Sequence, residues 1–237
     1  MFFINKLKSY FWEAKYCKNI KHSIALCNYL QTIKHQNYFK EPHKNHYVVL
    51  DTETTGLDYK KDKVISIGAV RIENLEINIS DSLEVILKTE NAGNKDNIAV
   101  HGIRNMDVQI GKDRKLFFEQ LLYYLQGDIV VGHHIAFDRN ILSYNIKEFF
   151  PIAILNPIID TLDLAIYYER LITNRNLHLE EINPKEYTLD KLIERYNIKA
   201  SGRHTAIGDA LITAELFLKL IKKLSQRKGF NIKKFMK

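Results

Sequence analysis

Four acidic residues and one histidine stand out in this chain because they lie in three short motifs. The first motif, Asp51-Thr-Glu53-Thr-Thr-Gly56, follows the apolar run 47–50. Side chains alternate along a strand, so Asp51 and Glu53 would project from one face at the strand's end, before a turn that Gly56 permits. Two carboxylates so close repel each other unless a cation lies between them. The spacing therefore predicts a site for a hard divalent cation, although a surface turn is the commoner explanation of an isolated D-x-E.

Asp138 ends the second motif, Gly132-His-His-Ile-Ala-Phe137-Asp138, and comes at the start of a predicted helix. A carboxylate at this place faces the backbone N–H groups that are exposed at a helix start, and it is favoured by the helix dipole. A helix cap is the simpler explanation of this segment alone. A metal ligand is the alternative.

His204 and Asp209 form the third motif, His204-Thr-Ala-Ile-Gly-Asp209. On one continuous helix, a separation of five residues would turn the two side chains about 140° apart. They can converge only if His204 lies on the loop before the helix and Asp209 lies inside it, and Thr205 is a suitable N-cap for such a helix. A histidine placed there could accept a proton near neutral pH. For this segment alone, an ordinary solvent-facing loop histidine is the simpler explanation.

The elements that must position these residues follow an α/β pattern. Apolar or alternating runs predict strands at 47–51, 63–72 and 76–87, with shorter runs at 129–131 and 157–159. Helical patterns occur at about 114–126, 138–149, 162–173, 188–196 and 205–224. Strands first, then helices alternating with strands, predict a mixed sheet with helices packed against it.

Both ends of the chain are basic. Residues 1–44 carry a net charge of +6 and residues 222–237 one of +7, so the intervening part is −6 in a chain of +7 overall. Such ends could bind phosphates beside an acidic metal site, or could simply be solvated, lysine-rich termini. We expect a helical extension over 1–44, a body over 45–224 and a basic tail over 225–237.

The extension over 1–44 contains the only tryptophan, Trp12, and several other aromatic residues. Leu26, Leu30 and Ile33 recur at helical spacing, and Pro42 closes the segment. This is more aromatic surface than a short helix can bury alone, so the extension is expected to pack on the body or on a partner. A basic DNA-binding arm, a docking helix and a brace on the body remain open.

Other sequence features argue against several classes of protein. No apolar run approaches the ~20 residues that span a bilayer, and lysines interrupt the N-terminal aromatic stretch before a secretory signal could form. We therefore expect no membrane association and a cytoplasmic protein. Cys17 and Cys27 lack a neighbouring pair or metal-ligand spacing, so reduced thiols are expected. The pair His133-His134 does not predict zinc, because adjacent side chains point apart and no cysteine joins them.

Together, the three motifs resemble the DEDDh exonucleases, the proofreading family that includes the epsilon subunit of bacterial DNA polymerase III. The order D-x-E-T-T-G, then F-D after a strand, then H-x4-D carries the resemblance, which covers residues 46–224. Further matches are His101-Gly-Ile103, Asp160-Thr-Leu162 and Tyr187-Thr-Leu-Asp190-Lys-Leu192. One departure is His134, where many relatives have an asparagine.

The resemblance implies an RNase H-like fold and 3′→5′ hydrolysis with two divalent ions, Mg²⁺ or Mn²⁺. Asp51 would bridge both ions, and Glu53 and Asp209 would complete one ion site. Asp138 would support the second ion through water. His204 would take the proton from the attacking water.

The resemblance also implies a substrate, the 3′ end of single-stranded DNA, and the residues that hold it: Thr52, Thr54, Leu57, His101 and Phe137. Of these, Leu57 and Phe137 would serve equally well as core residues. The D-T-E-T-T-G form is closer to the polymerase-associated branch, which favours DNA over RNA and makes a DNA polymerase subunit a candidate partner. An exoribonuclease on the same scaffold is one alternative, because the catalytic residues do not read the 2′-hydroxyl. A silent nucleic-acid or polymerase-binding module is the other, although no expected ligand is missing.

Overall fold

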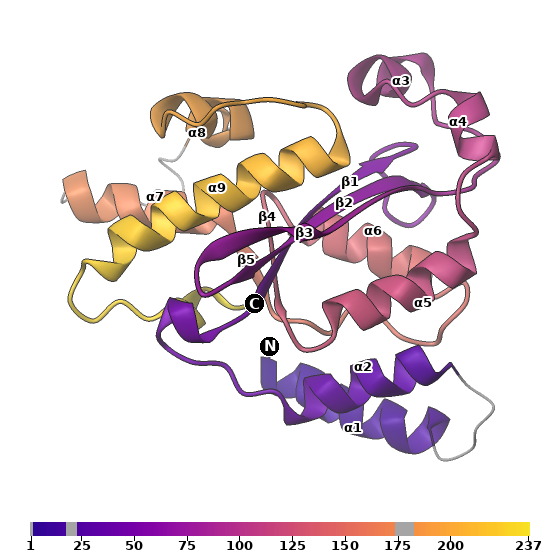
Figure 1. Cartoon of the computed structure of the whole chain (residues 1–237), viewed down its shortest axis with the longest axis horizontal. Helices are drawn as coiled ribbons and strands as arrows, with labels where there is room; N and C mark the ends of the chain where they lie inside the picture. Colours follow the sequence, from indigo (N-terminus) through magenta and orange to yellow (C-terminus); the bar gives the residue numbers. More distant parts are fainter. Residues whose placement is uncertain (1, 18–22, 174–182) are drawn as a thin grey trace.

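The computed structural model describes residues 2–17, 23–173 and 183–237 (Figure 1). Within them, strands form one sheet in the order β3-β2-β1-β4-β5. The strands are β1 (Tyr47–Thr54), β2 (Val64–Glu73), β3 (Glu76–Ile86), β4 (Ile129–Gly132) and β5 (Ile158–Asp160). The first three pair antiparallel, whereas β4 is parallel to both β1 and β5. The predicted mixed sheet is confirmed, with strand ends within a few residues of those expected.

Helices cover both faces of this sheet. One face packs against α2 (Ile24–His35), α5 (Arg114–Leu125) and α6 (Ala136–Ile146). The other packs against α7 (Thr161–Thr173), α8 (Leu189–Arg195) and α9 (Ala206–Ser225). Strand β1 serves both layers because its side chains alternate: Val48 and Leu50 face the first layer, and Tyr47 and Val49 face the second.

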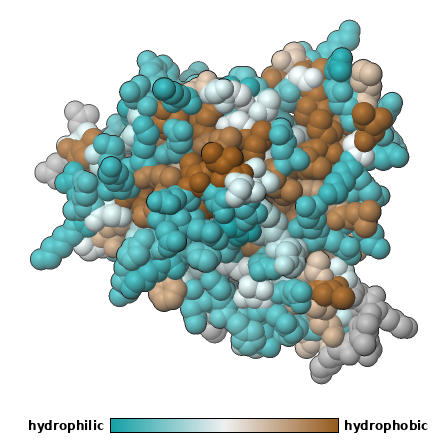
Figure 2. All heavy atoms as spheres, viewed as in Figure 1, coloured by the Kyte–Doolittle hydropathy of each residue, from teal (hydrophilic) through white to brown (hydrophobic). Residues whose placement is uncertain are grey.

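Two short helices between β3 and α5 were not predicted, namely α3 (Lys95–His101) and α4 (Asn105–Gln109). They are too short to show a clear helical period. The first begins at the N-cap Asn94, whose side chain accepts a hydrogen bond from the backbone of Asn97. Hydrophobic surface gathers over α3 and α4 and along α9 in Figure 2, with Met106 and Ile110 strongly exposed.

The N-terminal extension forms a hairpin of α1 (Phe2–Tyr16) and α2, which lies beside α5 (Figure 1). Tyr29 of α2 is fully buried, and its hydroxyl donates to Asn156 at 2.7 Å and accepts from the backbone N of Leu155 at 2.7 Å. The expected packing of this segment on the body is therefore confirmed for α2.

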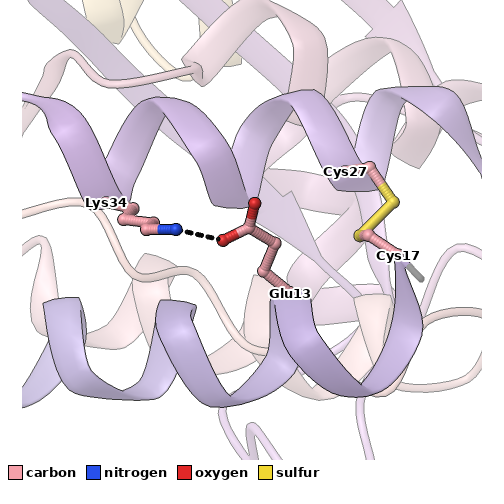
Figure 3. Close-up of a disulfide and its surroundings, with 4 residues drawn as sticks. All are labelled: Glu13, Cys17, Cys27 and Lys34. Carbon is pink, nitrogen blue, oxygen red and sulfur yellow. Dashed lines mark hydrogen bonds and ion pairs between the residues drawn. A yellow bond between two sulfur atoms is a disulfide. The ribbon is translucent and has the colours of Figure 1, made fainter.

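The expectation of reduced cysteines is wrong in this structure, because Cys17 and Cys27 form a disulfide between the two helices (Figure 3). Glu13 and Lys34 pair across the same hairpin at 2.9 Å. The cysteines lie ten positions apart, too far for a local motif, and only the reversal of the chain brings them together.

The basic C-terminal segment is attached to the body through apolar and backbone contacts, while its lysine and arginine side chains are exposed. It contains the short 3₁₀ helix η4 (Ile232–Phe235), in which Ile232 is fully buried. The backbone of Lys237 exchanges hydrogen bonds with Ile158 of β5. Other 3₁₀ turns in the described residues are η1 (Pro42–Lys44) and η3 (Pro184–Tyr187). No helix in the described ranges combines the length and apolar character that crossing a bilayer requires.

Candidate active site and metal centre

The end of β1 divides its side chains between the two helix layers. Asp51 and Glu53 continue the series of Tyr47 and Val49, so they project toward the layer that contains α9. Thr52 lies between them and projects toward the layer that contains α6. The predicted shared face of Asp51 and Glu53 is confirmed, and each helix layer can supply one further acid to this strand end.

The start of α9 lies directly on the neighbouring strand. Gly68 of β2 pairs with Asp51, and a Cβ atom at Gly68 would come within 2.1 Å of the backbone N of Ile207. Only a residue without a side chain permits this approach. Because Gly68 has no side chain, the first turn of α9 can lie against the β1–β2 pair. This places Asp209, in that turn, near Asp51 on β1.

The cap of α9 separates His204 from Asp209 as the sequence predicted. Thr205 is the N-cap, and its hydroxyl accepts a hydrogen bond from the backbone N of Gly208 at 3.1 Å. His204 lies on the preceding loop, exposed and with a left-handed φ of 63°. Asp209 lies inside the helix and is only 8% exposed.

Three predicted ligands come together at this point. Asp51, Glu53 and Asp209 each offer a carboxylate oxygen, and these oxygens all lie within 4.8 Å of one another. Burial, followed by the repulsion of Asp209 and Asp138, raises the pKa of Glu53 to about 7. Burial and the surrounding carboxylates also raise the pKa of Asp51 well above its usual range. Oxygen donors held so close at an electrostatic cost fit a hard divalent cation.

Asp138 joins the site from the opposite helix layer. It lies in the first turn of α6 and is 6% exposed. Asp138 does not occupy the N-cap position, which is Ile135, and its carboxylate accepts hydrogen bonds from Thr52 as well as from its own backbone N–H. Burial raises the pKa of Asp138 to about 7, against the lowering effect of the Thr52 bonds.

Arg203 is a site residue that sequence reasoning missed. Its guanidinium contacts the carboxylate of Asp209 and also pairs with Asp190 of α8 at 2.8 Å. The positive charge therefore lies against one of the three clustered carboxylates. Its position next to His204 in the H-x4-D motif was the signal available in the sequence.

The residues expected to hold substrate surround this strand end in different ways. The hydroxyl of Thr54 donates to the carbonyl of Gly56 at 2.7 Å, and Leu57 is 86% exposed just beyond the turn. Phe137 is half-buried against the core, one residue before Asp138. Thr52 uses its N–H and hydroxyl for Asp138. Leu57 is therefore exposed and does not belong to the core, whereas Phe137 packs partly against the core.

His101 lies at the end of α3 and is 7% exposed. Its Nδ1 accepts a hydrogen bond from the backbone N of Ile103 at 3.1 Å. Within the described part of the chain its buried Nε2 has no partner. Burial lowers the pKa of this imidazole, an effect that a hydrogen bond with the backbone of Ala92 partly offsets, and so favours the neutral form of the ring.

The adjacent histidines make separate contacts. The Nδ1 of His133 lies 2.9 Å from the hydroxyl of Thr161, and burial lowers the pKa of His133 to about 4. His134 adopts a left-handed φ of 58°, and its backbone N donates to Asp160 at 3.0 Å. Asp160 also accepts from the N of Leu162 at 3.0 Å, so it fixes the start of α7.

Comparison with known proteins places these motifs in a family. The Exonuclease (RNase_T) family model matches residues 48–217. The PolC-type DNA polymerase III of Lacticaseibacillus paracasei is 33% identical over 189 residues, which are 77% of this chain and 12% of the polymerase. The PolC-type polymerase of Thermotoga petrophila is 28% identical over 222 residues, 92% of this chain and 15% of the polymerase.

A solved structure of E. coli Exonuclease I in complex with a dA16 oligonucleotide has the same fold, with a TM-score of 0.64 at 16% identity. The match covers 77% of this chain and 42% of Exonuclease I. The chain spans only about an eighth of the polymerases that it matches. The matched region contains all three motifs and the clustered carboxylates, and the chain belongs to the exonuclease family.

Proposed function

We propose that this chain is a 3′→5′ exonuclease that removes nucleotides from the end of single-stranded DNA. The observation that carries the proposal is the cluster of Asp51, Glu53 and Asp209, whose oxygens lie within 4.8 Å of one another beside buried Asp138. Carboxylates that repel one another in the absence of a cation are suited to hold one. The family membership supports hydrolysis of nucleic acid as the reaction.

The donor set fits two divalent ions, Mg²⁺ or Mn²⁺, since it consists of carboxylate oxygens. Asp51 would contact both ions, Glu53 and Asp209 would complete one site, and Asp138 would support the other through water. Bound there, such ions supply Lewis acidity and charge stabilisation for an in-line displacement at phosphorus.

The remaining steps belong to the chain's own side chains. His204, exposed on its loop, would accept the proton of the attacking water. Thr54 and exposed Leu57 would hold the terminal nucleotide, with Phe137 and His101 beside it. Leu57 is well suited to pack on the terminal base, because 86% of its surface is free for contact.

DNA is the proposed polymer because the similar curated proteins are DNA polymerases. A DNA polymerase subunit is accordingly the proposed partner, and the cytoplasm is the proposed location. An exoribonuclease remains the second candidate, since the same carboxylates would act at the phosphate and would not read the 2′-hydroxyl.

The test is degradation of 5′-labelled single-stranded DNA and RNA of the same sequence, with Mg²⁺ or Mn²⁺ and with EDTA. The proposal expects a metal-dependent ladder that shortens from the 3′ end, faster on DNA. Asp51→Ala and His204→Ala should abolish it, whereas the exposed control changes Glu215→Ala and His43→Ala should not. Faster cleavage of RNA would favour the exoribonuclease. Absence of cleavage of both polymers would favour a binding module.

A further inference from the structure

A cavity of about 340 Å³ lies between the N-terminal helix α1 and helix α6. Among the described residues, the charged side chains that line it are all basic: Lys8 from α1, Arg139 from α6, and Lys147 at the C-cap of α6. Lys8 and Lys147 are exposed. Two acids adjoin the lining in sequence: Glu148 pairs with Lys63 and Arg114, and the carboxylate of Asp138 accepts hydrogen bonds from Thr52 in the candidate site. This cavity is therefore a locally positive site in the wall of the protein.

Helix α6 connects the cavity to the proposed active site. Phe137, Asn140, Tyr144 and Lys147 are separated by three, four and three residues, so they share one face of the helix. Asp138 lies in the first turn of the same helix. The ten residues from Phe137 to Lys147 correspond to ~15 Å along the helix axis. A nucleic-acid strand that runs from the carboxylate cluster along α6 would reach the cavity over this distance.

Aromatic rings alternate with basic groups along the same route. The rings of Tyr59 and Tyr144 meet edge to face, with centroids 5.5 Å apart. Lys147 lies 5.1 Å from the centroid of Tyr144, and Lys60 lies 5.9 Å from that of Tyr59. Tyr59 follows exposed Leu57 by two residues, which joins the rings to the turn of the first motif.

Helix α1 is fixed at the cavity by a buried contact. Asn5 is 8% exposed and donates from its side chain to the carbonyl of Leu155 at 3.1 Å. The hydroxyl of Ser143 on α6 accepts from the backbone N of Ile154 at 3.1 Å. Both helices are thus bound to the segment 153–155, which sets Lys8 and Lys147 around one opening.

We propose that Tyr59, Tyr144, Arg139, Lys147 and Lys8, here called the α1–α6 tract, bind single-stranded nucleic acid upstream of the 3′ end. Rings on which bases stack, interleaved with cations that contact phosphates, are the chemistry that recognises single strands. The inference rests on the proposed function for the direction of the strand. It gives the N-terminal extension a role, which is to complete the path of the substrate.

The test separates the tract from the catalytic centre by substrate length. Binding of a 5′-fluorescein oligo-dT of about twelve nucleotides is measured by anisotropy in EDTA over a series of salt concentrations. Hydrolysis of the p-nitrophenyl ester of thymidine 5′-monophosphate, which is too short to reach the tract, is measured with Mn²⁺. The variants are Lys8→Gln with Lys147→Gln, and Tyr144→Ala. The matched control is Lys222→Gln with Lys223→Gln, which removes the same charge from α9.

Both tract variants should weaken oligonucleotide binding about tenfold. The lysine pair should reduce the salt slope by about 1.4, as expected for two lost phosphate contacts on a single strand. Hydrolysis of the short ester and the melting temperature should stay at the level of the parent protein. Unchanged oligonucleotide binding, or an equal loss in the α9 control, would overturn the proposal. If the parent protein hydrolyses neither the short ester nor DNA, the proposed function is contradicted. The anisotropy measurement would still test the tract.

Discussion

One carboxylate oxygen of Asp138 accepts two hydrogen bonds from Thr52, from its backbone N at 3.1 Å and from its hydroxyl at 2.7 Å. Thr52 stands between the clustered acids Asp51 and Glu53 on β1. The bonds therefore tie α6, which carries Asp138, to the strand that carries two other acids. They also stabilise the ionised form of a buried carboxyl, the form that a cation requires.

Thr52→Val removes the hydroxyl bond and keeps the shape and the backbone bond. We expect the affinity for Mn²⁺ to fall by about tenfold, as is typical when a group that orients a metal ligand is lost. Isothermal titration calorimetry measures the affinity. Thr52→Ser is the matched control, since it keeps the hydroxyl, and equal affinities of the Val and Ser variants would contradict the prediction.

Arg203→Gln removes the cation that contacts Asp209 in the absence of metal. The guanidinium and a metal ion compete for the same carboxylate, so the variant should bind Mn²⁺ about fivefold more tightly. The metal-free variant should also melt at a lower temperature, because the carboxylates lose their counter-charge.

Asp190→Asn offers the comparison, because it removes the second partner of Arg203 without altering Asp209. Isothermal titration calorimetry measures the affinity for Mn²⁺, and melting in EDTA measures the stability of the metal-free protein. Weaker Mn²⁺ binding by Arg203→Gln would show that the arginine assists the ion instead of competing with it.

The metal-free protein should lose stability as the pH rises. The folded pKa values of Glu53 and Asp138 are both about 7, and that of Asp51 is also raised. Unfolded carboxyls titrate near 4, so the folded state holds more protons between about pH 4 and 7. The stabilising contribution is complete below the unfolded pKa and is lost as the pH rises through the folded pKa.

Melting in EDTA from pH 5 to 8 should therefore show a decline on the order of 5 °C. Saturating Mg²⁺ should reduce the decline, and Asp51→Asn should do so without metal. A melting temperature in EDTA that increases over this range would contradict the assignment of the raised pKa values.

The Cys17–Cys27 disulfide should stabilise the N-terminal hairpin by ~2–3 kcal/mol, as expected for a closed loop of about ten residues. Dithiothreitol should therefore lower the melting temperature of the native chain. The Cys17→Ser, Cys27→Ser double variant should melt at the reduced value and should not respond to dithiothreitol. In the proposed cytoplasmic location the bond would be subject to reduction. Identical melting curves with and without dithiothreitol would contradict a stabilising role.

The sequence predicted those elements whose local patterns agree with their packing. Alternation in 47–54 was enough to place Asp51 and Glu53 on one face, and the N-cap chemistry of Thr205 was enough to place His204 outside α9. Roles in catalysis and substrate contact stay predictions, because side-chain position alone does not test them.

Contacts between distant segments could not be predicted. Arg203 pairs with Asp190 of α8, thirteen residues earlier in the chain, only because the loop before α9 lies beside α8. Likewise, the hydroxyl of Thr52 finds Asp138 across 86 residues of sequence. Each depends on the final packing of helices on the sheet, for which no short motif carries a signal.

Gly68 has no side chain, and this lets the backbone of α9 lie directly against β2, opposite Asp51. A chain could retain all four acids and the histidine and still be unable to assemble them, if this one position had gained a methyl group. Any survey of relatives for loss of activity should therefore inspect this glycine together with the acids. An intact motif guarantees the ligands, whereas the glycine guarantees the distance between them.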